Sequence, residues 1–166
     1  MKPIEDLCVD FYNENHAIAS KWYEEHPKDD HPPSLLLLKS DNSIDVIVLT
    51  MIMNDEQAGT KAAMIQQTML GMRLGEVYVK AAMLINEAWL RRMKPGEQLE
   101  ANRPRNKDHP DRIEVLMFNL LTEHKQAIMS CEIDRKKRTL EQVPLQWLNK
   151  LPKGETVSGN MVRNSD

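Results

Sequence analysis

The chain has 166 residues, of which 41% are hydrophobic and 28% are charged, and its formal net charge is -3. This length fits one domain with one sizeable core, and this composition differs from that of disordered chains and of membrane proteins. The small negative charge offers no global field that would attract a polyanion, which disfavours a general nucleic-acid binder. Two cysteines are too few for a disulfide framework, and no segment reaches the roughly 18 apolar residues of a membrane helix. We therefore expect a cytoplasmic protein without membrane contacts.

The first part of the chain predicts a helix followed by a hairpin. Residues 3–25 carry an apolar stripe at helical spacing with acids in the first turn, which is typical of an amphipathic helix. Three prolines in residues 26–33 end this helix, because proline disfavours helical geometry at its own position and at the one before. Residues 34–39 and 44–52 then form two short apolar runs. The Asp41-Asn42 pair between them favours a turn, so we expect a hairpin.

A second helix and a long strand follow. The helix begins at Asn54, whose side chain can cap it, and ends at Gly71 or Gly75. Residues 76–93 are ambiguous, because their Ala, Met, Leu and Glu content favours a helix whereas their apolar residues alternate as in a strand. We predict a strand over residues 77–91, since Gly75 separates this run from the helix before it.

The last part of the chain predicts a long loop and a second hairpin. Residues 94–111 are polar and contain three prolines, and a loop of this length is uncommon unless it is functional or disordered. Residues 112–121 and 126–135 have the composition of two strands, of which the first is apolar on both faces. We therefore predict a single α+β domain over residues 1–140, with two helices packed on one face of a mainly antiparallel sheet of about five strands, in the order α-β-β-α-β-β-β. Residues 141–166 are expected to form a partly flexible C-terminal extension.

One acidic side chain of the predicted long strand is a candidate for chemistry. Glu87 lies on the same face as Trp89, and a partly buried carboxylate beside an indole can act as a general acid or base. Its expected neighbours are Asp111, Arg112 and Glu114. The other interpretation is a structural ion pair between Glu87 and Arg112 that fixes the register of two strands. We favour the ion pair, because a single carboxylate without a spaced partner is a weak catalytic signal.

A metal-assisted hydrolase or nuclease would need acidic and imidazole side chains to converge, and zinc accepts both as ligands. The candidates for this role are Glu87, His109, Asp111 and Glu114. Their spacing matches no metal motif, and the six glycines form no phosphate-binding or dinucleotide loop. We expect no metal and no cofactor, and an enzyme is the less favoured class. Cys131 lies on the apolar face of its strand, so we interpret it as a core thiol.

Two short basic groups could contact phosphates by charge if they meet at one edge of the sheet. They are Arg103, Arg105 and Lys107 in the long loop, and Arg135, Lys136, Lys137 and Arg138 after the last strand. Aromatic residues make up only 5% of the chain, which gives little support for stacking on bases. Solvated turns are the favoured interpretation of both groups.

Three segments resemble a pattern found in small uncharacterised proteins encoded by prokaryotes and their phages. They are Glu87-Ala88-Trp89, His109-Pro110-Asp111-Arg112-Ile113-Glu114-Val115-Leu116 and Glu132-Ile133-Asp134-Arg135. In that group a helix, a hairpin and a second helix precede a Glu-Ala-Trp strand, which leads through a Pro-x-Arg-x-Glu segment to a closing hairpin. The resemblance covers residues 5–138 and implies a strand over residues 77–91, but it implies no activity. The loop departs from the pattern, since Arg103-Pro104-Arg105 stands where the group has a Pro-Ser pair.

The leading functional hypothesis is a small non-enzymatic binding or accessory protein of bacterial or phage type. It would act on a protein partner, or on a second copy of the chain in a homo-oligomer, through the long loop and the sheet edge. The alternatives are the metal-assisted hydrolase or nuclease and a nucleic-acid-binding regulator that uses the basic groups.

Overall fold

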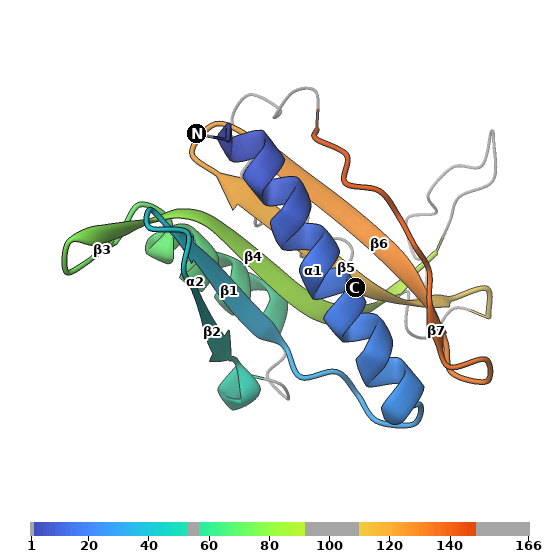
Figure 1. Ribbon diagram of the computed structural model, residues 1–166. Coiled ribbons are helices and arrows are strands. Elements are labelled where there is room, and N and C mark those ends of the chain that lie inside the picture. Colours follow the sequence, from blue (N-terminus) through green and yellow to red (C-terminus); the bar gives the residue numbers. More distant parts are fainter. Residues whose placement is uncertain (1, 53–56, 92–109, 149–166) are drawn as a thin grey trace.

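The computed structural model describes residues 2–52, 57–91 and 110–148. Within these residues the chain forms two α-helices, one short 3-10 helix and seven strands (Figure 1). In chain order they are α1 (Ile4–Glu25), β1 (Ser34–Lys39), β2 (Ile44–Val48), η1 (Thr50–Ile52), α2 (Ala58–Met69), β3 (Arg73–Leu74), β4 (Val77–Leu90), β5 (Ile113–Thr122), β6 (Gln126–Asp134) and β7 (Thr139–Leu140).

The strands of the described residues form one antiparallel sheet. Its order is β2-β1-β4-β5-β6-β7, and the short β3 pairs with the start of β4. The two longest strands, β4 and β5, lie at its centre and pair from Ala81 opposite Thr122 to Leu90 opposite Ile113. Strand β5 is buried from Val115 to Thr122. Because successive side chains of a strand point to opposite faces, both faces of this central pair must be covered.

Helix α1 crosses one face of the sheet (Figure 1). Its apolar stripe buries Phe11 and Tyr12 in a core that includes Met83 and Ile85 of β4 and Phe118 of β5. The ring of Phe118 packs edge-on against that of Tyr12, with 5.2 Å between their centroids. This side of the sheet holds the larger of the two helix-covered cores.

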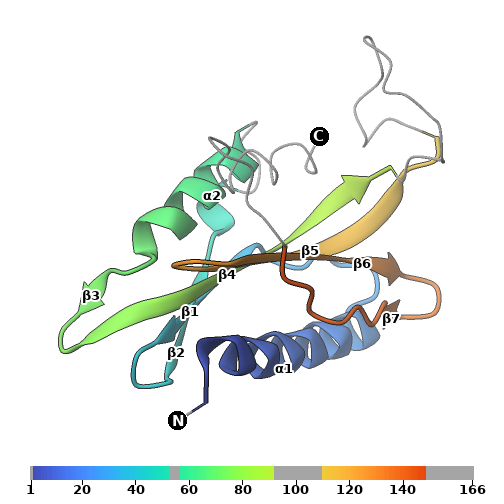
Figure 2. The same cartoon turned by 90° about the horizontal axis from the view of Figure 1, so that it is seen from above.

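Helix α2 covers the opposite face of the sheet (Figure 2). Its Ala62 and Ala63 pack in a second core with Leu35 of β1 and with Ala82 and Leu84 of β4. These β4 residues alternate in sequence with those that face α1, as the geometry of a strand requires. The prediction that both helices pack on one face is therefore wrong, because a central pair of strands that is apolar on both sides needs a helix on each.

The predicted α+β class is confirmed, and so are both hairpins and the strand over residues 77–91. The structure has more strands than the predicted five or so, because β3 and β7 are two-residue strands, too short to leave an alternating pattern. Helix α2 ends at Met69, two residues before Gly71 adopts a φ of 80°. The expected start of this helix at Asn54 lies outside the described residues. No helix in the described ranges is both long and apolar enough to cross a membrane.

A buried carboxamide ties α2 to the centre of the sheet. The side chain of Gln66 is fully buried, and its Nε2 donates hydrogen bonds to the carbonyl oxygens of Ala82 in β4 and Asn119 in β5, each at 2.9 Å. Both bonds cross from α2 to the sheet, so they hold the helix in place above the two strands.

We expect Gln66→Ala to lower the free energy of unfolding by about 1 to 3 kcal/mol, because it removes two buried hydrogen bonds to the sheet. Gln67 is the next residue along α2 and is exposed, so Gln67→Ala should change stability by less than about 0.5 kcal/mol. Chemical denaturation of both variants measures this difference. Equal effects of the two substitutions would contradict the role of Gln66.

Candidate functional site

A cluster of four charged side chains and one tyrosine lies at the end of β6, on the face of the sheet that α1 covers. Its members are Tyr23, Asp30, Glu87, Glu114 and Arg135, and we call it the Arg135 cluster. Nε of Arg135 donates to Glu114 at 2.5 Å, and Nη2 donates to Glu87 at 3.0 Å and to Asp30 at 3.4 Å. One guanidinium therefore links β4, β5 and the loop that follows α1.

The remaining donors of Arg135 also reach that loop. Nη1 donates to the carbonyl oxygens of Pro27 at 3.3 Å and Asp29 at 2.8 Å. The carbon atom of the guanidinium lies 5.6 Å from the centre of the Tyr23 ring, within the range of a cation–π contact. A guanidinium has five N–H donors, and each donor of Arg135 has an acceptor. A guanidinium with all of its donors engaged is typical of a structural interaction that holds elements together. It is not typical of a ligand-binding group, which keeps donors free.

Glu87 is the most buried carboxylate of the Arg135 cluster, with 15% of its side chain exposed. Burial raises the pKa of Glu87, while the Tyr23 hydroxyl, the backbone N–H of His31 and the Arg135 guanidinium oppose that rise. Tyr23 donates its hydroxyl proton to Glu87 at 2.5 Å, and burial beside this carboxylate raises the pKa of Tyr23. Glu87 is thus held by three donors, an arrangement that suits a fixed ion pair.

The structure gives Glu87 a different cationic partner from the expected one. Glu87 lies opposite Leu116 in the β4–β5 register, whereas Arg112 comes four residues before Leu116, just ahead of β5, or about 13 Å away at the usual rise of a strand. The guanidinium of Arg112 instead lies over the ring of Trp89, 4.9 Å from its centre. Arg135 reaches Glu87 because it follows β6, whose register brings it close to Glu114.

The other predicted catalytic residues do not join this cluster in the described part of the chain. Asp111 and Arg112 are exposed, and each has an interaction partner. His109 lies outside the described residues. Within the described ranges, no group of three or more His, Cys, Asp and Glu side chains is placed to hold a metal ion.

Cys131 lies in the core, as its place in the sequence indicates. It is fully buried on the α1 side of the sheet, and its Sγ lies 3.6 Å from the hydroxyl of Tyr12. Burial raises the pKa of the Cys131 thiol to about 11, so the thiol stays protonated at neutral pH. A protonated, enclosed thiol is a poor nucleophile.

The basic residues after β6 divide into two kinds. Arg135 belongs to the Arg135 cluster, whereas Lys136, Lys137 and Arg138 are exposed. The turn between β6 and β7 borders a hollow of about 550 Å³ whose lining residues are Pro27, Lys28, Arg135, Lys136 and Arg138. The loop candidates Arg103, Arg105 and Lys107 lie outside the described residues. The hollow therefore has basic residues on two sides, from the β6–β7 turn and from Lys28 in the loop that follows α1.

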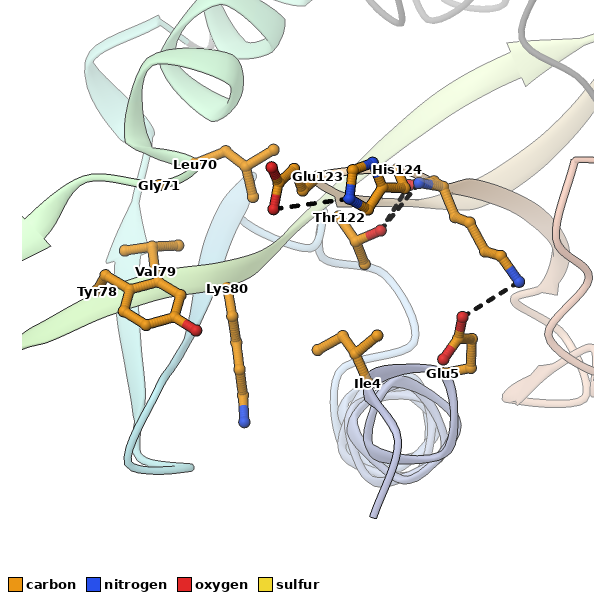
Figure 3. A pocket seen from close by; sticks show the side chains of 11 residues that line it. Ile4, Glu5, Leu70, Gly71, Tyr78, Val79, Lys80, Thr122, Glu123 and His124 are labelled. Atoms are coloured by element: carbon orange, nitrogen blue, oxygen red, sulfur yellow. Dashed lines mark hydrogen bonds and ion pairs between the residues drawn. The ribbon is translucent and has the colours of Figure 1, made fainter. Parts of the chain in front are cut away.

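A separate cavity of about 570 Å³ lies where the N-terminal turn of α1, the start of β4 and the β5–β6 turn meet (Figure 3). Its charged side chains already have partners. Glu5 pairs with Lys125 at 3.2 Å, and a carboxylate oxygen of Glu123 lies 3.8 Å from Nε2 of His124. Nζ of Lys80 donates a hydrogen bond to Oδ1 of Asn42 in the β1–β2 turn. These groups therefore engage one another rather than converge on a ligand.

Strand β2 is one edge of the sheet, and among the described residues it pairs with β1 alone. Ile44, Val46 and Val48 are 39%, 60% and 46% exposed. These three side chains stand opposite Leu38, Leu36 and Ser34 of β1. Leu36 and Leu38 belong to the core beneath α1, so the exposed residues form an extension of that core face. We call Ile44, Val46 and Val48 the β2 stripe.

The sequence did not reveal the β2 stripe as a candidate site. Its only local signal is a β-branched residue at every second position from Ile44 to Val48, and such alternation normally marks the buried side of a strand. Whether that side is covered depends on the position of α1, which the local pattern does not contain.

Comparisons with known proteins found no matching family model, no matching curated protein and no matching solved structure. The function of the chain must therefore be inferred from its own residues.

We expect Arg135→Met to lower the free energy of unfolding by about 2 to 4 kcal/mol, because Glu87 and Glu114 would stay largely buried without their cation. Arg135→Lys should recover only part of this loss, since an ammonium cannot serve five acceptors at once. Lys137→Met in the same turn is the matched control and should cost less than about 0.5 kcal/mol. Chemical denaturation checks all three values, and an Arg135→Met effect as small as that of the control would contradict the structural role of Arg135.

Proposed function

We propose that the protein is a small binding or accessory protein that docks a protein partner on the β2 edge of its sheet. The observation that carries this proposal is the β2 stripe, an apolar surface beside the unpaired backbone of an edge strand. An exposed strand of this kind is a template for pairing with another chain.

The opposite edge of the sheet supports the proposal by contrast. There β7 pairs with the end of β6, the N–H of Glu141 donates to the carbonyl oxygen of Glu132, and the N–H of Leu148 donates to that of Gln126. Residues 139–148 therefore occupy much of the outer side of β6. The β2 edge has no such cover within the described residues.

The composition of β2 also favours docking. Proteins usually protect an exposed edge strand with lysine, proline or a bulge, yet β2 reads Ile44-Asp45-Val46-Ile47-Val48. Its single charge, Asp45, pairs with Lys39 of β1 at 3.1 Å. Apolar, β-branched and electrically neutral, this edge resembles the core of a protein interface more than an ordinary surface.

We expect Val46→Lys to weaken partner binding by about tenfold or more, because a docked partner would have to bury the new ammonium without a counter-charge. Val46 is 60% exposed, so the unfolding free energy should change by less than about 0.5 kcal/mol. The measurement is affinity capture from cells with the tagged protein, followed by titration of the recovered partner, including any untagged copy of this chain.

The matched control is Met64→Lys, because Met64 is also an exposed apolar residue, 60% exposed, but lies on α2 at the other face of the sheet. It introduces the same charge and should leave binding unchanged. Equal binding by wild type and the folded Val46→Lys variant would overturn the proposal.

A second candidate function is contact with nucleic-acid phosphates, and the hollow bordered by Lys28, Lys136 and Arg138 favours it. Contacts of this type are salt-dependent. Lys136→Gln combined with Arg138→Gln should lower the slope of log affinity against log salt by about 2 for a DNA oligonucleotide. Lys2→Gln, just before α1, combined with Lys21→Gln on α1 removes the same charge as a control. No retardation of DNA by the wild-type protein at low salt would contradict this candidate.

A further inference from the structure

We infer that the partner at the β2 edge is a second copy of this chain, joined by antiparallel pairing of β2 with β2 about a twofold axis at Val46. This inference rests on the proposed function and names its partner. The resulting sheet would run without interruption through both copies.

The hydrogen-bonding pattern of the β1–β2 hairpin shows which groups of β2 point outward. Lys39 N donates to Ser43 O at 2.9 Å, and Leu49 N donates to Pro33 O at 2.7 Å. Hydrogen-bonded and non-hydrogen-bonded pairs alternate along an antiparallel ladder. Hence the odd-numbered residues of β2 bond to β1, and the N–H and C=O groups of the β2 stripe residues point away from the sheet.

These outward groups determine one symmetric register. They belong to Ile44, Val46 and Val48, a set that is centred on Val46. In a twofold pairing Val46 faces Val46 of the other copy, and Ile44 faces Val48 of the other copy. Every outward N–H then meets an outward C=O, as in the hydrogen-bonded pairs of an ordinary antiparallel ladder.

The side chains fit the same register. A twofold axis perpendicular to the sheet keeps equivalent faces on the same side, so the two β2 stripes join into one apolar surface. Each cross-strand pair within the β2 stripes is then β-branched against β-branched, a favourable combination in sheets.

The charges of β2 permit two copies to meet. Asp45 is the one charged residue of the strand, and its carboxylate lies 3.1 Å from the ammonium of Lys39 in the same chain. In the inferred register Asp45 faces Ile47 of the other copy rather than a second Asp45. The meeting edges are therefore neutral and do not repel each other. A foreign strand would need to match this edge by chance, whereas a second copy matches it by symmetry.

The first test is the mass of the full-length protein by light scattering across a concentration series. Wild type should change from monomer to dimer as concentration rises. Val46→Pro deletes an N–H that points outward and leaves the β1–β2 bonds intact, and proline is tolerated on an edge strand. It should raise the dimer dissociation constant by about tenfold or more, while Val46→Ile keeps the dimer.

The second test reads the register with cysteines and does not depend on the proline variant folding. Under mild oxidation Val46→Cys should give a disulfide-linked dimer, because residues directly opposite in a hydrogen-bonded pair have Cα atoms about 5.5 Å apart. Ile44→Cys should not, since the two copies of residue 44 are four residues out of register, but Ile44→Cys with Val48→Cys should link. The native Cys8 and Cys131 are both buried and provide no background.

The outcomes separate this inference from the proposed function. If the wild-type protein stays monomeric at all concentrations, and the Val46→Lys variant no longer captures a different protein that wild type captures, the dimer is ruled out. The β2 strand then remains the docking edge. A dimer that survives Val46→Pro, or that links through Ile44→Cys alone, also overturns the inference. If Val46→Lys alters neither the mass nor any capture, both the inference and the proposed function fail.

Discussion

The central constraint on this fold is that β4 and β5 are apolar on both faces. Burial of Met83 and Ile85 on one side and of Ala82 and Leu84 on the other requires a helix against each side. The core beneath α1 takes its sheet residues from β1, β4, β5, β6 and β7, and none from β2. Because α1 lies over the centre and contacts β7 and the residues after it, no described helix covers β2 on the same face. The exposed edge is a consequence of how the core is closed.

The Arg135 cluster follows from the same arrangement. Helix α1 ends over the sheet, and the loop after it carries carbonyl groups and Asp30 toward the end of β6. There Arg135 satisfies these groups together with Glu87 and Glu114, so that no member of the cluster is left as a buried unpaired charge. Acidic side chains that suggest catalysis in the sequence thus serve to hold a loop against the sheet. The interactions of Glu87 are those of a well-satisfied ion pair, and the raised pKa of Glu87 reflects burial.

The two edges of the sheet differ in a way that bears on function. On the β6 side, β7 and the following residues take up backbone groups of the last long strand. On the β2 side, a neutral β-branched strand presents its backbone and the β2 stripe together. Backbone pairing and apolar burial can therefore act at the same place, which is the combination that strand-mediated association requires. The basic hollow beside the β6–β7 turn lies at the other end of the strand order and leaves the β2 edge unobstructed.

The amino-acid sequence was enough to predict the α+β class, the two helices and the two hairpins, but not the two-residue strands β3 and β7. The stripe of α1 and the turn residues Asp41 and Asn42 act within a few residues, so local patterns placed the first helix and the first hairpin. The pattern of β4 was ambiguous, and its assignment as a strand depended on Gly75 and on the resemblance as well. The tertiary structure was needed to show that the helices lie on opposite faces, that Arg135 rather than Arg112 is the partner of Glu87, and that the β2 stripe is exposed. These outcomes depend on strand register and on which surface a helix covers. Both are set by contacts between residues far apart in the chain, and a local period carries no information about them.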